Sequence, residues 1–377
     1  ELLSAMVLVP WETLAAEMTN RYEERSRLSG VRMICSQLGG FLAVSVPGVI
    51  MQFTGKDNPF TYTLTGLIFS CVFCLAVFIT WYTTWEAKDV HQESNFKVDN
   101  QRKGGLGNHL KYLVLDLFSS FRIRAFRLHI LIYIFSFTAM DVFGSVFTYY
   151  VVYCLSQDAS AVSGWLSIAA FASVPGTYGF MLLLNRLNMT PSAALRLSYG
   201  CIFLVLAFLF TVYLTKTQVP TLLFSAVFIL LGAARSGLYY IPWNIYSFIP
   251  DIDEMVTQQR REGIFAGVMV LTRKSTVAIA IMIIGLVLQE SGFVKGSGAQ
   301  PESALGAIIG LMIFATAALL AVSFFTTYKF RLTRETHKLL LKEIARRKLG
   351  GDYRDCDDRT RVVIKQLTGY EYDQVWG

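Results

Sequence analysis

Two charged side chains lie deep inside long apolar runs of this 377-residue chain. Lys274 follows Gly263 by eleven residues, which is about 16 Å along a helix. Asp141 is the only carboxylate in its run, fourteen residues past Arg127. Charges at such depth in a membrane cost at least about 2–3 kcal/mol and usually serve a function. Lys274 is predicted to be functional or to form a buried pair with an acid. Asp141 is predicted to hold a proton, bind a cation or pair with Lys or Arg.

Arg235, Tyr239 and Trp243 are spaced by four residues in another apolar run, so they share one face of a helix. Aromatic rings stack on the apolar side of a sugar ring, and an arginine donates hydrogen bonds to hydroxyls or to a carboxylate. We therefore expect this stripe to line a binding cavity. The alternative is ordinary packing between helices.

A charged sequence motif occurs twice, in residues 8–32 and in residues 241–263. We call this repeated motif the doubled phrase, and its two copies the first and the second phrase. Each copy contains Pro-Trp, a few mostly apolar residues, an acidic cluster, an arginine pair and a glycine. Its charged residues are expected on loops that pair with each other as gates, or else form a solvated charge run. The residues assigned to these gates are Glu17, Arg25, Asp251, Asp253, Arg260 and Arg261.

The elements that must position these residues are long and apolar. Hydrophobic residues make up 54% of the chain and charged residues 16%, whereas a soluble chain is about one quarter charged. About 20 apolar residues cross a bilayer as a helix, and the runs are too long and too little alternating for barrel strands. The predicted membrane helices lie near 1–19, 31–54, 61–85, 127–156, 161–185, 196–215, 220–250, 264–290 and 304–328.

Lys and Arg gather in alternate loops and in the segment after residue 328, which predicts that these parts face the cytoplasm. The net charge of +7 reflects this bias and not nucleic-acid binding. The sequence shows no phosphate-binding loop, nucleophile elbow or metal-ligand spacing. We therefore expect a multi-pass membrane protein that is not an enzyme and needs no cofactor.

The repeat of this phrase predicts a fold built from two similar halves. If it marks equivalent points in two halves, each half has six helices, and three more are expected before residue 1. This is the plan of the major facilitator transporters: an all-α membrane protein with twelve helices, nine of them here, and a cavity between two six-helix halves. The expected divisions are 1–85 (helices four to six), 86–126 (a cytoplasmic linker with an interfacial helix), 127–328 (helices seven to twelve) and 329–377 (a cytoplasmic tail).

The motifs "PW…AAEMT…ER…R" and "PW…PDIDE…RREGIF…RK" resemble those of the glycoside–pentoside–hexuronide:cation symporter family, the melibiose permease-like transporters. The resemblance implies alternating-access symport of a sugar with Na⁺ or H⁺ in a bacterial inner membrane. It also implies that Lys274 couples cation binding to sugar binding. Asp141 and Lys274 are expected to be the coupling residues and the salt-bridge partners of the C-terminal half.

The first copy of the phrase departs from the pattern of that family. The acidic residue two positions before the proline is Leu8 here, and the aromatic residue two positions after it is Glu12, with Trp11 one earlier. The arginine of the following helix matches Arg32 with a slip of one residue. Trp11, Glu12 and Arg32 are therefore expected to keep the pocket but to change its chemistry away from galactosides.

The expected substrate is a glycoside, an oligosaccharide or a uronate, carried by a monomer in the lipid bilayer. Two alternatives from other classes stay open. One is a carrier of lysolipids or other amphiphiles with the same fold, and the other is a membrane sensor of that fold that transports nothing.

Overall fold

The computed structural model describes residues 6–7, 11, 14, 18–19, 21–54, 59–84, 117–157, 159–216, 219–259, 261–297 and 299–376. Within these residues every regular element is a helix. The main elements are α2 (Tyr22–Thr54), α3 (Phe60–Thr83), α6 (Arg124–Tyr149), the π-helical turn η1 (Tyr150–Cys154), α7 (Ala159–Asn185), α8 (Pro191–Thr215), α9 (Thr221–Tyr246), α10 (Ile249–Thr257), α11 (Glu262–Glu290), α12 (Glu302–Ile309), the π-helical turn η2 (Gly310–Ala315), α13 (Thr316–Thr327), α14 (Arg334–Lys348) and α15 (Asp358–Thr368).

Seven described stretches are long and apolar enough to cross a membrane, and they coincide with seven of the predicted runs. They are α3, α6 with η1, most of α7, α8, α9 through α10, α11, and α12 through α13. The predicted run 31–54 lies within α2, a single helix of 33 residues. The run 1–19 lies mostly outside the described residues. The all-α membrane fold is thus confirmed.

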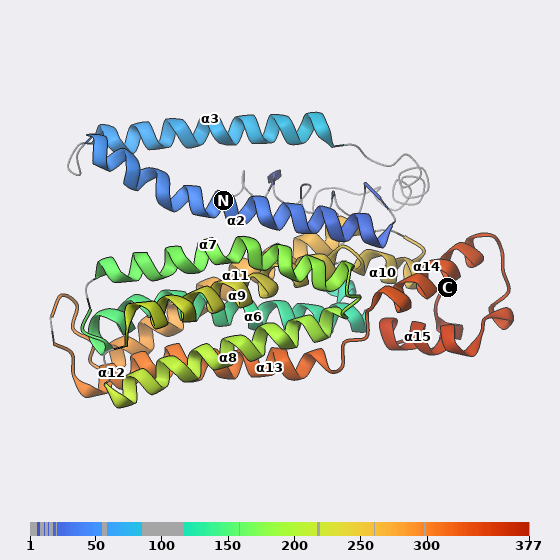
Figure 1. Ribbon diagram of the computed structural model, residues 1–377. Coiled ribbons are helices and arrows are strands. Elements are labelled where there is room, and N and C mark those ends of the chain that lie inside the picture. The colour runs from blue at the N-terminus through green and yellow to red at the C-terminus, as the bar shows by residue number, and fades with distance from the viewer. Residues whose placement is uncertain are drawn as a thin grey trace, which may run out of the picture.

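The membrane-length helices lie roughly parallel (Figure 1). Helices α6 to α13 form one bundle, α2 packs on it through α7 and α9, and α3 packs on α2. Helices α14 and α15 lie at one end of the bundle (Figure 1). The division of the chain into two halves and a linker stays a prediction. Residues 85–116 lie outside the described residues, and in the rest of the expected linker residues 117–120 are helical.

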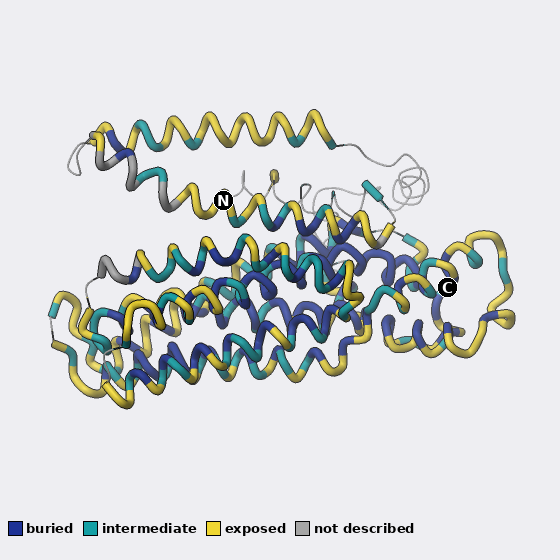
Figure 2. The backbone as a smooth tube through the Cα atoms, in the orientation of Figure 1, coloured by how far each residue is buried: buried dark blue, intermediate teal, exposed yellow. Residues whose placement is uncertain are grey.

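Helix α3 is apolar and exposed along nearly its whole length (Figure 2). Its mean hydropathy reaches 2.3, and Thr61 is its one buried residue. Such a surface would aggregate in water but suits a lipid environment, because a helix that is hydrophobic all round is a membrane span or a core element. The exposure therefore indicates a lipid-facing helix.

Helices α7 and α9 approach each other closely because small residues line their contact. A Cβ added at Gly232 would lie 2.0 Å from the Ala169 carbonyl oxygen, and one at Gly176 would lie 2.8 Å from the Ala233 Cα. Small residues at helix contacts let backbones approach, which gives van der Waals packing where no hydrophobic driving force exists. This contact fixes α9, the helix that carries the predicted stripe.

The segment predicted as a cytoplasmic tail is a folded pair of helices. Thr333 and Thr336 form a capping box at the start of α14, and the Asp357 side chain caps α15. Arg346 donates two hydrogen bonds to Glu343, at 2.8 and 3.0 Å, and Tyr372 donates to the same carboxylate. Both helices pack on α10, and α15 also packs on α6. The C-terminal helices therefore cover one end of the bundle.

Candidate functional site

The acids of the second phrase lie on the short helix α10, not on the expected loop, and the fold buries them. Pro250 lies in the first turn of α10, where its missing N–H costs nothing, and Gln258 ends the helix in the left-handed conformation. Asp251 and Asp253 are at most 1% exposed. Buried carboxylates need charged or hydrogen-bonding partners because their transfer from water is costly. The partners of these two acids define the first part of the site.

Arg25, in the first turn of α2, is a partner of Asp251. Its Nη1 donates to Asp251 Oδ2 at 2.6 Å, and neither side chain is more than 1% exposed. The same nitrogen donates to the Ser247 carbonyl at 2.8 Å, and Nε donates to the Thr19 carbonyl at 2.5 Å. This ion pair joins the two copies of the doubled phrase, 226 residues apart in the chain.

A histidine from α14 meets the same carboxylate. His337 Nε2 lies 2.8 Å from Asp251 Oδ2, and its fully buried ring packs edge-on against Phe248. We call Arg25, Ser247, Asp251 and His337 the Asp251 junction. It holds α2, α10 and α14 together. No local pattern marks His337, because 86 residues of the chain separate it from its partner.

A buried polar network continues the junction along α2 and α9. Asn244 Nδ2 donates to Ser26 Oγ at 2.7 Å and to Tyr240 Oη at 2.9 Å. The Tyr240 and Ser26 hydroxyls lie 3.1 Å apart, and Ser26 donates to Asn185 Oδ1 at 2.9 Å. These groups are polar on an otherwise apolar interface, so they fix the register of α2 against α7 and α9.

The other residues predicted as gates do not belong to the Asp251 junction. Asp253 accepts two hydrogen bonds from Arg261, at 2.6 and 2.8 Å, so this ion pair closes within the second phrase. Lys348 of α14 lies 2.8 Å from the Glu254 carboxylate. Glu17 and Arg260 lie outside the described residues.

Asp141 pairs with Arg273 deeper in the bundle. Two guanidinium nitrogens of Arg273 donate to the two Asp141 oxygens, at 2.5 and 2.8 Å, and both side chains are about one quarter exposed. This bidentate pair is the strongest common geometry for these groups. Of the three alternatives for Asp141, the structure shows the pair with a basic residue. Lys274, the next residue on α11, is exposed.

Arg235 and Tyr239 of the predicted stripe contact each other. Arg235 Nη2 donates to Tyr239 Oη at 3.0 Å, and its guanidinium carbon lies 5.1 Å from the Tyr239 ring centre. Phe137 of α6 packs on the Tyr239 ring at 4.7 Å and also lies 5.2 Å from the Arg273 guanidinium. The stripe on α9 and the ion pair between α6 and α11 thus share one aromatic ring.

Arg32 lies between two indole rings. Its guanidinium carbon is 4.9 Å from the Trp11 ring centre and 4.6 Å from that of Trp243. Both distances are within the range of cation–π attraction. All three side chains are half-buried. Glu12 lies outside the described residues.

A chain of aromatic rings connects Arg32 to the Asp141–Arg273 pair. Trp243 packs edge-on against Tyr133 at 5.8 Å, Tyr133 packs on Phe137 at 4.5 Å, and Phe137 packs on Tyr239. The structure therefore brings Trp11, Arg32, Arg235, Tyr239, Trp243, Asp141 and Arg273 into one continuous group, which we call the central cluster. Arg273 was not among the site residues predicted from the sequence. The angular offset of about 100° between adjacent helix positions explains why only one of Arg273 and Lys274 meets Asp141.

Comparison with known proteins identifies the family of this chain. Residues 1–334 match the sequence family described as MFS/sugar transport protein. The chain belongs to this family. This is a family of transport proteins, and the membrane-length helices make the chain a multi-pass membrane protein.

Two curated relatives are named as symporters. The uncharacterized symporter sll1374 of Synechocystis sp. is 30% identical over 222 residues, which cover 56% of this chain and 39% of the relative. The uncharacterized symporter YnaJ of Bacillus subtilis is 22% identical over 344 residues, which cover 90% of this chain and 69% of the relative. The chain thus matches less than half the length of the first relative.

Proposed function

We propose that the protein is a melibiose permease-like symporter that moves a sugar together with Na⁺ or H⁺ by alternating access. The observation that carries this proposal is Arg32 held between Trp11 and Trp243. Sugars present apolar ring faces and a rim of hydroxyls, so their sites combine aromatic faces with strong hydrogen-bond donors. The central cluster offers both within one group of side chains.

The charges of the central cluster specify the kind of polar group it recognises. Among its described residues the central cluster holds three arginines, Arg32, Arg235 and Arg273, and one carboxylate, Asp141, so donors and positive charge exceed acceptors. Hydroxyl oxygens and carboxylates accept hydrogen bonds from guanidinium groups. We therefore infer a glycoside, an oligosaccharide or a uronate as substrate, with Glu12 part of the same site.

Coupling is assigned to Asp141, Arg273 and Lys274. A cation or proton that competes for Asp141 weakens its pair with Arg273, and Arg273 then has donors available for the substrate. Lys274 supplies a second positive charge one residue away on α11. Binding of cation and substrate are thereby linked through a shared carboxylate, as linkage requires for any two ligands.

The Asp251 junction is assigned as the gate on the cytoplasmic side, where the excess of Lys and Arg places the C-terminal helices. Arg25–Asp251 joins α2 to the bundle, and His337 adds α14, which supports a role of this junction in closing this end. Arg261–Asp253 braces the start of α11. Opening must break a buried ion pair, and sugar binding must supply the free energy that this requires. The proposed setting is a bacterial inner membrane with the C-terminus inside.

The experiment that tests substrate class is direct binding. The full-length protein in detergent is titrated with a panel of neutral glycosides, oligosaccharides, uronates and lysophospholipids, with and without Na⁺. A uronate or glycoside that binds wild type and is lost in Arg32→Ala supports the proposal. The matched control is Arg196→Ala, which removes an arginine stacked on Tyr328 elsewhere in the bundle. Selective binding of lysophospholipids overturns it in favour of an amphiphile carrier.

A further inference from the structure

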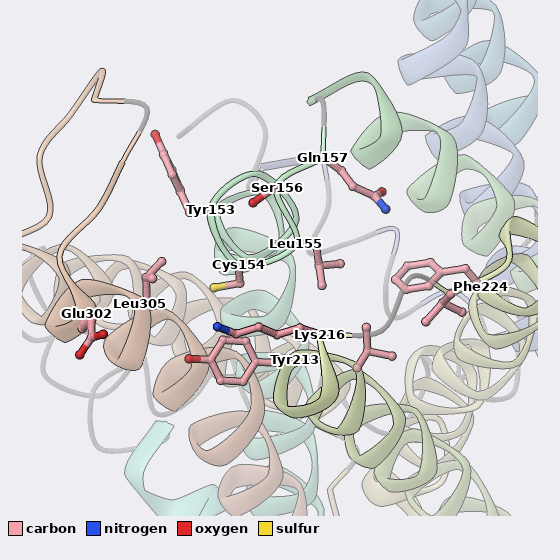
Figure 3. A pocket seen from close by; sticks show the side chains of 12 residues that line it. Tyr153, Cys154, Leu155, Ser156, Gln157, Tyr213, Lys216, Phe224, Glu302 and Leu305 are labelled. Carbon is pink, nitrogen blue, oxygen red and sulfur yellow. The ribbon is translucent and has the colours of Figure 1, made fainter.

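The end of the bundle opposite α14 and α15 contains a cavity of about 930 Å³ (Figure 3). Its wall is formed by the π-helical turn η1, the end of α8, the start of α9 and the first turns of α12. None of the central-cluster residues lines it. We call it the end cavity. Its volume is in the range of small-molecule sites.

Two opposite charges lie on the wall of the end cavity. Lys216 ends α8, and Glu302 begins α12. The Lys216 side chain extends across the cavity toward the side where Glu302 lies (Figure 3). Both residues are exposed, and within the described part of the chain neither forms a hydrogen bond or an ion pair through its side chain. The cavity therefore offers a cation and an anion to one ligand.

The depth of the cavity in the membrane identifies its environment. Its charged and aromatic lining lies where membrane-length helices end or begin: η1 ends at Cys154, α8 ends at Thr215 and α12 begins at Glu302. That level corresponds to the lipid headgroups. Tyr153 and Tyr213 line the same cavity, and tyrosine is enriched at this level of membrane proteins.

The wall also has an unusual backbone and an apolar part. The residues of η1 form a π-helical turn, an element that is often found at functional sites. Leu155, Val219 and Phe224 line the cavity next to the charged pair. A ligand with a zwitterionic group and an attached apolar part matches both kinds of surface.

We propose that the end cavity binds the headgroup of a zwitterionic phospholipid. Lys216 contacts the phosphate, Glu302 contacts the ammonium group, and the apolar wall contacts the glycerol backbone and upper acyl chains. Anionic lipids lack the ammonium group and meet the Glu302 carboxylate, so the site discriminates against them. The proposal is independent of which solute the central cluster carries.

The test is lipid retention by the full-length protein in micelles doped with equal amounts of phosphatidylethanolamine and phosphatidylglycerol, read by native mass spectrometry. Wild type is expected to retain phosphatidylethanolamine preferentially. Lys216→Gln and Glu302→Gln should each weaken that retention by about tenfold, the effect of losing a charge-assisted hydrogen bond. The matched controls are Lys295→Gln and Glu290→Gln, exposed residues at the same end that do not line the cavity.

Three outcomes would overturn the proposal. One is equal retention by wild type and both cavity variants, and another is equal loss in the control variants. The third is competition by soluble glycerophosphoethanolamine at the same affinity as the lipid, which would show that the apolar wall contributes nothing and that the ligand is a soluble zwitterion.

Discussion

Arg25 and Asp251 form a fully buried ion pair at 2.6 Å although 226 residues separate them. Each belongs to one copy of the doubled phrase, so the two copies contact each other in the folded protein. His337 contacts the same carboxylate oxygen at 2.8 Å, so one oxygen links three helices. Opening of the gate that we propose here must separate these groups.

Removing Arg25 should open this end of the bundle. Breaking a buried ion pair costs about 3–5 kcal/mol because the remaining charge stays buried. In Arg25→Ala, a cysteine at the buried position Ser29 should react with a membrane-impermeant thiol reagent at least tenfold faster, in a background without the six native cysteines.

Arg21→Ala is the control for that experiment. Arg21 pairs with Glu24 at the surface, with 82% of its side chain exposed, and such pairs contribute about 0–1 kcal/mol. In Arg21→Ala, the cysteine at position 29 should react at the same rate as in the protein that carries only this cysteine and keeps Arg21 and Arg25. Equal rates in Arg25→Ala and Arg21→Ala would show that the Arg25–Asp251 pair does not hold this end shut.

Replacing Gly232 with alanine should destabilise the bundle. The added Cβ would lie 2.0 Å from the Ala169 carbonyl oxygen, so α7 and α9 must move apart. Overpacking of this kind costs about 1–3 kcal/mol. Gly179→Ala in α7 adds the same atom with nothing within 4 Å, and it should be neutral or stabilising. Thermal unfolding of both variants in the same detergent measures the difference, and equal midpoints would refute the close-contact account.

The C-terminal helices should loosen at acid pH through Glu343. Burial raises the pKa of this carboxyl, but hydrogen bonds from Arg346 and Tyr372 outweigh burial and leave the pKa below its ordinary value. A lowered pKa stabilises the fold above the unfolded value of about 4.3 and loses this contribution as the pH falls through the folded value. We expect hydrogen exchange of α15, corrected for intrinsic rates, to speed up between about pH 5 and pH 3.

Glu343→Gln should remove most of that pH dependence, since an amide does not titrate in this range. The control is Glu335→Gln, which lies on the same helix and is 83% exposed. A pH profile of Glu343→Gln that matches wild type would assign the acid response to other groups.

Trp243 should contribute to substrate binding through its ring. Phenylalanine preserves a stacking surface and should weaken binding only slightly, whereas alanine also removes the cation–π contact with Arg32. We expect a loss of affinity of at least about tenfold in Trp243→Ala. Isothermal titration with the best-binding sugar measures it. Unchanged affinity in Trp243→Ala would show that Trp243 only packs between helices and does not contact the substrate.

Hydropathy predicted the helices well because membrane length and composition are local properties. Residues 31–54, 61–85 and the later runs all correspond to described helices. The helix α10 was not predicted, because Asp251, Asp253 and Glu254 were expected on a loop, either as paired gate residues or as a solvated charge run. Burial of these acids depends on Arg25, Arg261 and Lys348, which come from three other segments.

The spacing within α9 correctly placed Arg235 and Tyr239 on one face, where they form a hydrogen bond. The partner of Asp141 could not be read in the same way. Arg273 and Lys274 are adjacent and both basic, and only the rotation of α11 about its axis decides which one reaches α6. The sequence also contains no short-range pattern for His337, since its contact joins two segments that meet only in the folded bundle.

Gradient-driven uptake into proteoliposomes tests the central claim most directly. The full-length protein is reconstituted with a radiolabelled glycoside or uronate that it binds, under an imposed Na⁺ or H⁺ gradient. Wild type and Lys329→Ala, an exposed control, should accumulate the sugar above its outside concentration. Lys274→Ala should lose accumulation while it still inserts and folds. Accumulation by Lys274→Ala equal to wild type, or no dependence of wild-type uptake on either gradient, would contradict the account.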